Sequence, residues 1–141
     1  MNYKQLKDKQ QKRINELDLM FAFSDQQFME QLENHGWTLE NHPELFNIGS
    51  GGFCTEETLT EFKQVLNQNK RELAKALKDD KFFVDAVIYE AWNHEYAYNP
   101  EDEEILECFN LTVDELQKDE KRLNLYNKAI REYLKEFNEL N

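Results

Sequence analysis

The sequence predicts a mainly α-helical protein that contains at most a small β-hairpin. Glycine and proline are scarce, at four and two among 141 residues, which disfavours a turn-rich β protein. Residues 82–96 form the most apolar stretch, with hydrophobic side chains all round a helix, so a helix over 80–98 is expected to be buried. Helix-capping patterns recur along the chain. We therefore expect five or six helices packed round the 80–98 helix.

The length of the chain favours one domain, 1–141, in which a polar helix over 1–18 is peripheral. That first helix has only a thin apolar stripe over residues 3–18. The short apolar run 19–23 is interpreted as a strand or a buried connector. Ser24, with a glutamine three residues later, predicts the start of a helix that ends near Gly36.

A β-hairpin is expected over 45–54, around the glycine-rich segment Gly49–Gly52. Backbone N–H groups of such a segment can also hold a phosphate. The segment lacks the Lys-Ser/Thr of a P-loop, and no Lys or Arg occurs over 25–61. A turn is therefore the favoured interpretation.

The remaining sequence is punctuated by further caps. The next helix begins at Thr58 or, one turn earlier, at Thr55. Asp79–Asp80 end that helix and cap the apolar one. Asn99, followed by proline, predicts the start of a short helix, and Thr112 opens a long final helix that reaches about residue 138.

A polar cluster is predicted in the second half of the apolar helix: Glu90, Asn93, His94 and Glu95. Because buried polar groups must be paired, these side chains are expected to tie the helix to neighbouring backbone. Glu90 and His94, four residues apart, share a helix face and could instead bind a metal or exchange a proton. A zinc-protease helix would need histidine where Tyr98 stands. We therefore predict no metal, no cofactor and no catalytic residue.

The formal charge of −12 is concentrated in two blocks. Residues 25–61 contain eight acidic and no basic residues, and residues 90–120 contain eleven acidic residues against Lys118 alone. Such a field repels nucleic acid and attracts basic surfaces, although it can also serve solubility alone. The predicted partner-binding residues belong to the second block: Glu101, Asp102, Glu103, Glu104, Glu107, Asp114 and Glu115.

Three sequence blocks carry a resemblance to a known family. They are Phe21-Ala22-Phe23-Ser24-x-x-Gln27-Phe28, Ile48-Gly49-x-Gly51-Gly52-Phe53 and Glu90-x-x-Asn93-His94-Glu95-Tyr96. The chain resembles small uncharacterised proteins carried by bacteriophages, prophages and other mobile elements of low-GC bacteria. The resemblance covers about residues 19–117. It implies an accessory role in a bacterial cytoplasm, and analogy with small acidic proteins of such elements suggests inhibition of host defence.

The expected function is that of a non-enzymatic, acidic interaction protein. Its expected partner is a host protein with a basic surface, such as a nuclease, and it is not expected to bind nucleic acid or a membrane. An anti-CRISPR or anti-restriction role follows from the analogy. The alternatives are a small-ligand or metal-dependent enzyme centred on Glu90, His94 and Glu95, and a structural or regulatory phage protein. No signal peptide is recognised, and the two cysteines give no disulfide framework, so a cytoplasmic location is expected.

Overall fold

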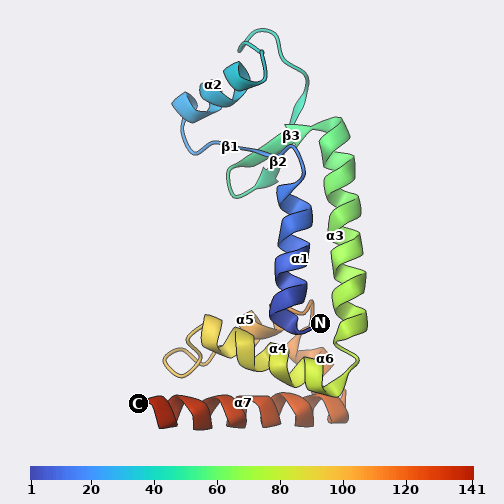
Figure 1. Cartoon of the computed structure of the whole chain (residues 1–141), viewed down its shortest axis with the longest axis vertical. Coiled ribbons are helices and arrows are strands. Elements are labelled where there is room, and N and C mark those ends of the chain that lie inside the picture. The colour runs from blue at the N-terminus through green and yellow to red at the C-terminus, as the bar shows by residue number, and fades with distance from the viewer. The chain divides into compact units, whose positions relative to one another are not determined.

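A computed structural model describes residues 1–141 and contains seven α-helices and one three-stranded antiparallel sheet (Figure 1). The predicted mainly α-helical fold class is confirmed, although seven helices replace the five or six expected and a third strand joins the expected hairpin. The contacts divide the chain into two compact units. Unit 1 comprises residues 1–9 and 69–141, and unit 2 comprises residues 10–68. Helices α1 (Tyr3–Asn15) and α3 (Glu56–Ala76) have residues in both. The single-domain organisation stays a prediction.

Unit 2 is built on the sheet, whose strand order is β1-β3-β2. Strands β2 (Leu45–Gly49) and β3 (Gly52–Thr55) form the predicted hairpin. Strand β1 (Met20–Phe21) adds an edge that pairs with β3, so the apolar run near residue 20 is a strand. The central strand β3 is buried over its first three residues, and the Phe53 ring lies 5.2 Å from the ring of Phe28. Backbone pairing and a few apolar side chains thus hold this unit together.

Helix α2 (Asp25–Asn34) begins and ends as the sequence predicts. The Ser24 hydroxyl accepts a hydrogen bond from the backbone N–H of Gln27, 3.2 Å away. At the other end, Gly36 has a φ of 73°, and the N–H of Trp37 reaches back to the carbonyl of Leu32. This is the Schellman ending that a glycine makes easy.

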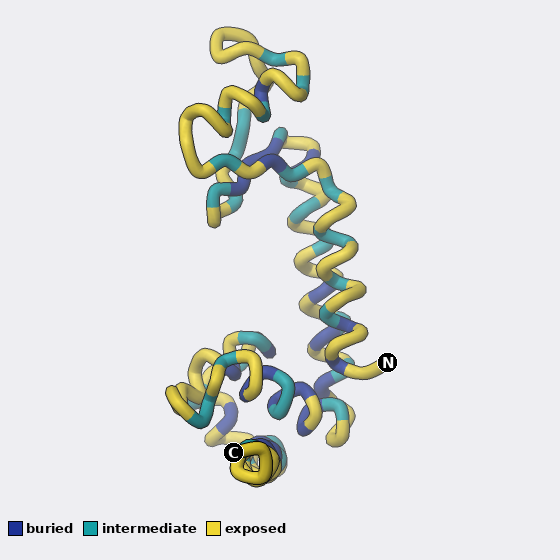
Figure 2. Tube along the Cα trace, turned by 60° about the vertical axis from the view of Figure 1, so that its left-hand side comes forward, coloured by how far each residue is buried: buried dark blue, intermediate teal, exposed yellow.

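Unit 1 is built on α4 (Asp80–Asn93), which packs mainly against α7 (Glu120–Leu140). The short helices α5 (Asp102–Glu107) and α6 (Val113–Gln117) complete it, together with the unit 1 residues of α1 and α3. Three predicted core residues are almost fully buried, with exposed fractions of 1% for Phe83 and 0% for Val87 and Ala91. Buried positions, coloured dark blue in Figure 2, recur along α4. The all-round apolar character of α4 is explained by neighbours on most of its faces.

Helix α4 ends at residue 93, five residues earlier than predicted. The N–H of Glu95 bonds to the carbonyl of Trp92, and the N–H of Tyr96 bonds to that of Ala91. Glu95 has a φ of 52°, so this is another Schellman ending, with glutamate in the position that glycine usually occupies. Because no glycine stands at this position, the sequence pattern did not predict the end of the helix.

Three other helix starts can be compared with the sequence predictions: one settles an open choice between two caps, and two differ from the prediction. Thr55, rather than Thr58, precedes α3 and accepts a hydrogen bond from the N–H of Thr58. The Asn99 cap is wrong, because Asn99 lies in the turn that follows α4 and α5 begins at Asp102 without a side-chain cap. The long helix after Thr112 is interrupted, because the Asp119 carboxylate caps a new helix by accepting from the N–H of Arg122.

Candidate functional site

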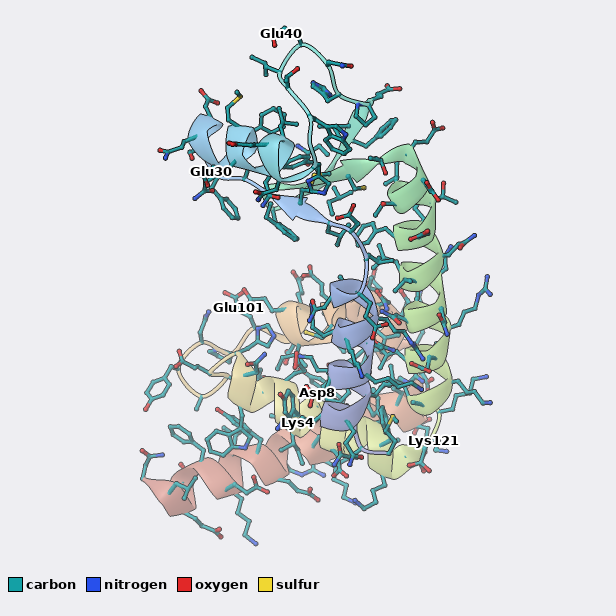
Figure 3. The ribbon with its side chains drawn as sticks, turned by 45° about the horizontal axis from the view of Figure 1, so that its top comes forward. Lys4, Asp8, Glu30, Glu40, Glu101 and Lys121 are labelled. Carbon is teal, nitrogen blue, oxygen red and sulfur yellow. The ribbon has the colours of Figure 1, made fainter.

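The acidic residues predicted to bind a partner are all exposed. They lie on or beside α5 and α6: Glu101, Asp102, Glu103, Glu104, Glu107, Asp114 and Glu115. Figure 3 labels Glu101, which stands just before α5. Thr112 caps α6 as predicted, since its hydroxyl accepts from the N–H of Glu115 and donates to the Glu115 carboxylate.

A hollow of about 280 Å³ opens on this acidic surface. Three carboxylates and three smaller or apolar side chains line it: Glu103, Glu107, Leu111, Thr112, Val113 and Asp114. Asn110, with a φ of 58°, lies in the turn between α5 and α6, and Leu111 and Thr112 of that connection line the hollow. No Lys or Arg lines the hollow, so its carboxylates have no cation in place.

Asp102 differs from its acidic neighbours because its carboxylate has structural partners. One of its oxygens accepts hydrogen bonds from the hydroxyls of Tyr96 and Tyr126, at 2.8 and 2.7 Å. Burial, followed by the hydrogen bond to Asp102, raises the pKa of Tyr96 to about 12 and raises that of Tyr126 further. Asp102 therefore joins α5 to the turn after α4 and to α7.

Glu90 is the buried carboxylate of unit 1, with a side chain only 1% exposed. Lys7 binds one of its oxygens at 2.8 Å, and His94 Nε2 lies 3.5 Å from the other. Burial alone raises the pKa of Glu90. Hydrogen bonds from Cys108 and Lys7, and the charges of Lys7 and His94, outweigh burial and hold that pKa below its usual value.

Two other residues of this cluster, His94 and Cys108, lie at helix ends. His94 is the C-cap of α4, and Cys108 is the C-cap of α5. The Cys108 sulfur lies 3.4 Å from His94 Nε2, while His94 Nδ1 lies 3.6 Å from a Glu104 oxygen. Glu90, His94 and Cys108 thus present three ligand atoms within 4.8 Å of one another.

Cys108 at His94 Nε2 and Glu104 at His94 Nδ1 have the order of a nucleophile, a base and its orienting group. Burial, and then the hydrogen bond to Glu90 and its charge, raise the pKa of Cys108 to about 12. The thiolate is the nucleophilic form of cysteine, so Glu90 suppresses the reactive species at neutral pH. The arrangement favours ligand binding or structure over covalent catalysis.

The structure brings together only half of the predicted polar cluster. Asn93 and Glu95 are exposed and lie outside the Glu90–His94 contacts. Lys7, Cys108 and Glu104 take their places, and sequence reasoning missed all three. Glu104 was assigned to the acidic surface alone. A local pattern could not reveal Lys7 or Cys108, because Lys7 lies 83 residues before Glu90 and Cys108 lies 14 residues after His94, at the end of another helix.

The glycine-rich segment of unit 2 has the geometry of a turn. Gly49 and Gly51 have φ values of 91° and 77°, and Ser50 between them has 51°. The left-handed φ of Gly51 favours glycine there, and an added Cβ would also lie 2.6 Å from the exposed Phe23 ring. A larger hollow of about 750 Å³ adjoins this turn, and no Lys or Arg lines it to hold an anion.

Comparison with known proteins places the chain in a family. Residues 2–132 match a family of unknown function, DUF7659, and the chain belongs to that family. The match includes α1 and more than half of α7, which the sequence blocks had left outside. No curated protein and no solved structure matches the chain. None of its helices combines the length and apolar character that crossing a membrane requires.

Proposed function

We propose that the protein is a non-enzymatic interaction protein that binds a basic surface of another protein through the hollow on α5 and α6. The observation that carries the proposal is the lining of this hollow, in which the carboxylates of Glu103, Glu107 and Asp114 lie together with the apolar side chains of Leu111 and Val113. An arginine or lysine side chain has the matching chemistry. Its aliphatic stem can cover the apolar part while its charged group meets the carboxylates.

The surrounding charge supports the same partner. The net charge of −12 provides a long-range field that accelerates encounter with a basic protein and opposes contact with nucleic acid. Glu103 and Glu107 are separated by one helix turn, which places their Cβ atoms about 5–6 Å apart on one face of α5. A surface that normally contacts successive phosphates could recognise such a row.

The biological setting of the proposal is a bacteriophage or another mobile element in a bacterial cytoplasm. It is supported by the resemblance of the three sequence blocks to small proteins of such elements. There, an acidic protein that occupies the nucleic-acid groove of a nuclease acts as an anti-CRISPR or anti-restriction inhibitor. The partner is then a host protein, and the inhibitor itself contacts no nucleic acid or membrane.

Affinity capture from a bacterial lysate, followed by mass spectrometry, identifies the partner. The variant Glu103→Lys/Glu107→Lys/Asp114→Lys should lose the captured protein, and increasing salt should release it from the parent. Three exposed ion pairs of up to about 1 kcal/mol each imply roughly a tenfold to hundredfold loss of affinity.

A matched control separates the hollow from the net charge. Glu33, Glu40 and Glu44 are exposed acidic residues of unit 2, and their change to lysine alters the charge equally. Figure 3 labels Glu40 at the outer end of the loop after α2. This control should retain the partner. Equal loss in both triple variants, with both still folded by circular dichroism, would show that only net charge matters and would refute the proposed site.

A further inference from the structure

Three side chains with metal-binding atoms converge where α4 and α5 end. His94 Nε2 lies 3.5 Å from a Glu90 oxygen and 3.4 Å from the Cys108 sulfur. Tetrahedral Zn²⁺, with N and O ligands at about 2.0 Å and sulfur at about 2.3 Å, sets its ligand atoms about 3.3–3.6 Å apart. We propose that Glu90, His94 and Cys108 form a Zn²⁺-binding site.

The second oxygen of Glu90 and the second ring nitrogen of His94, which would not bind the proposed ion, already have partners. Lys7 binds the other Glu90 oxygen at 2.8 Å, and Glu104 lies 3.6 Å from His94 Nδ1. A histidine that ligates zinc usually contacts a carboxylate or carbonyl through its second nitrogen. Lys7 and Glu104 therefore act as positioning residues, because they occupy Glu90 Oε1 and His94 Nδ1 and leave Glu90 Oε2 and His94 Nε2 facing each other, with Cys108 at the same nitrogen.

The charges of the site balance when zinc is bound. Zn²⁺ displaces the Cys108 thiol proton to solvent, a bond forms between the sulfur and the metal, and no oxidation or reduction occurs. The thiolate and the Glu90 carboxylate neutralise the two positive charges of the ion. In the formal charge of the site, the positive charge of Lys7 and the negative charge of Glu104 cancel. A set of one sulfur, one nitrogen and one oxygen favours zinc over magnesium or calcium, which prefer oxygen ligands alone.

The protein provides three ligands, so the fourth position of the tetrahedron is left for water. The His94 side chain is 29% exposed, which gives solvent a route to the ion. This inference goes beyond the proposed function and does not depend on it. The hollow is lined by Glu103, Glu107 and Asp114, none of which ligates the ion.

Titration of the full chain with Co²⁺, after treatment with a chelator, tests the site. The expected result is one bound Co²⁺ per chain, with tetrahedral absorption bands and a sulfur-to-cobalt charge-transfer band that Zn²⁺ abolishes. Cys108→Ser should lose the charge-transfer band. Cys54→Ser is the matched control and should keep it, since Cys54 is buried in unit 2. Glu104→Gln should weaken Zn²⁺ binding about tenfold.

A measurement on the parent protein covers the case in which Cys108→Ser does not fold. Zn²⁺ should slow alkylation of Cys108 by iodoacetamide and leave Cys54 unaffected, as read by mass spectrometry of peptides. Absence of a charge-transfer band in the parent, unchanged Co²⁺ binding by folded Cys108→Ser, or equal alkylation of Cys108 with and without Zn²⁺ would each overturn the proposal.

Discussion

The two units use opposite means to make tight turns. In unit 2, positive φ angles occur at Gly36, Gly49 and Gly51, with Ser50 as the exception. In unit 1 they occur at Glu95 and Asn110, which are not glycines. Unit 1 also has the larger set of buried apolar side chains, gathered round α4. The difference indicates that a large core can impose a strained backbone, whereas a small sheet needs residues that adopt it freely.

The chain provides a separate reporter for each unit. Trp37 lies in unit 2 and Trp92 in unit 1, and the sequence has no other tryptophan. Fluorescence of Trp37→Phe therefore follows unit 1, and that of Trp92→Phe follows unit 2. Urea unfolding of these two backgrounds allows each change below to be assigned to one unit.

The largest expected effect comes from the core of unit 1. Phe83 is 1% exposed, and its truncation in Phe83→Ala should cost about 3–5 kcal/mol because a cavity remains. The Trp92 transition should move to much lower urea. Leu140→Ala is the control, since Leu140 is 76% exposed and its loss should change stability by less than about 0.5 kcal/mol. Equal midpoints for Phe83→Ala and the parent would show that α4 is not the centre of this core.

A smaller effect is expected in unit 2. Gly51→Ala forces alanine into a left-handed conformation, which should lower stability by about 1–2 kcal/mol as read from Trp37. The added Cβ also meets the Phe23 ring, but that side chain is 76% exposed and can move away. Gly36→Ala is the matched control, since Gly36 has a φ of 73° and no atom within 4 Å of an added Cβ. Similar losses of stability in the two variants would identify backbone strain as the cause. Unchanged stability in both variants would contradict that explanation.

The smallest effect is a gain in unit 1. Glu95→Gly should raise its stability by up to about 1 kcal/mol, because glycine adopts a φ of 52° without steric cost. Asn110→Gly should gain less, since asparagine tolerates this conformation better than glutamate does. A loss of stability in Glu95→Gly, measured by the Trp92 transition, would mean that the Glu95 side chain makes a contribution larger than the strain.

Local patterns predicted the elements that local interactions determine. The caps at Ser24, Asp79 and Thr112 are confirmed, because each side chain accepts from an N–H three residues later. The hairpin is confirmed by the pairing of β2 with β3, and the burial of the apolar helix by the low exposure of Phe83, Val87 and Ala91. The stop after α4 was not predictable, since glutamate is a poor signal for a left-handed turn.

Long-range contacts account for most of what the sequence did not reveal about the sites. Glu90 and His94 are neighbours on one helix face, so their proximity followed from their spacing. Cys108 reaches them only because α5 ends beside the end of α4, and Lys7 arrives from the other end of the chain. The exposure of the acidic residues was expected from charge alone, but the hollow among them combines α5, the connection after it and the start of α6, which no local pattern predicted.

Unit 1 is assembled from two segments that the ribosome makes at very different times. Tyr3 and Leu6 are only 4% and 3% exposed, and they share a core with Tyr133. At about 5–20 residues per second, roughly 6–26 s separate the synthesis of Tyr3 from that of Tyr133. All of residues 10–68 are made in that interval. During translation, therefore, the whole segment of unit 2 is synthesised while the first aromatic residue of unit 1 still lacks its final partners.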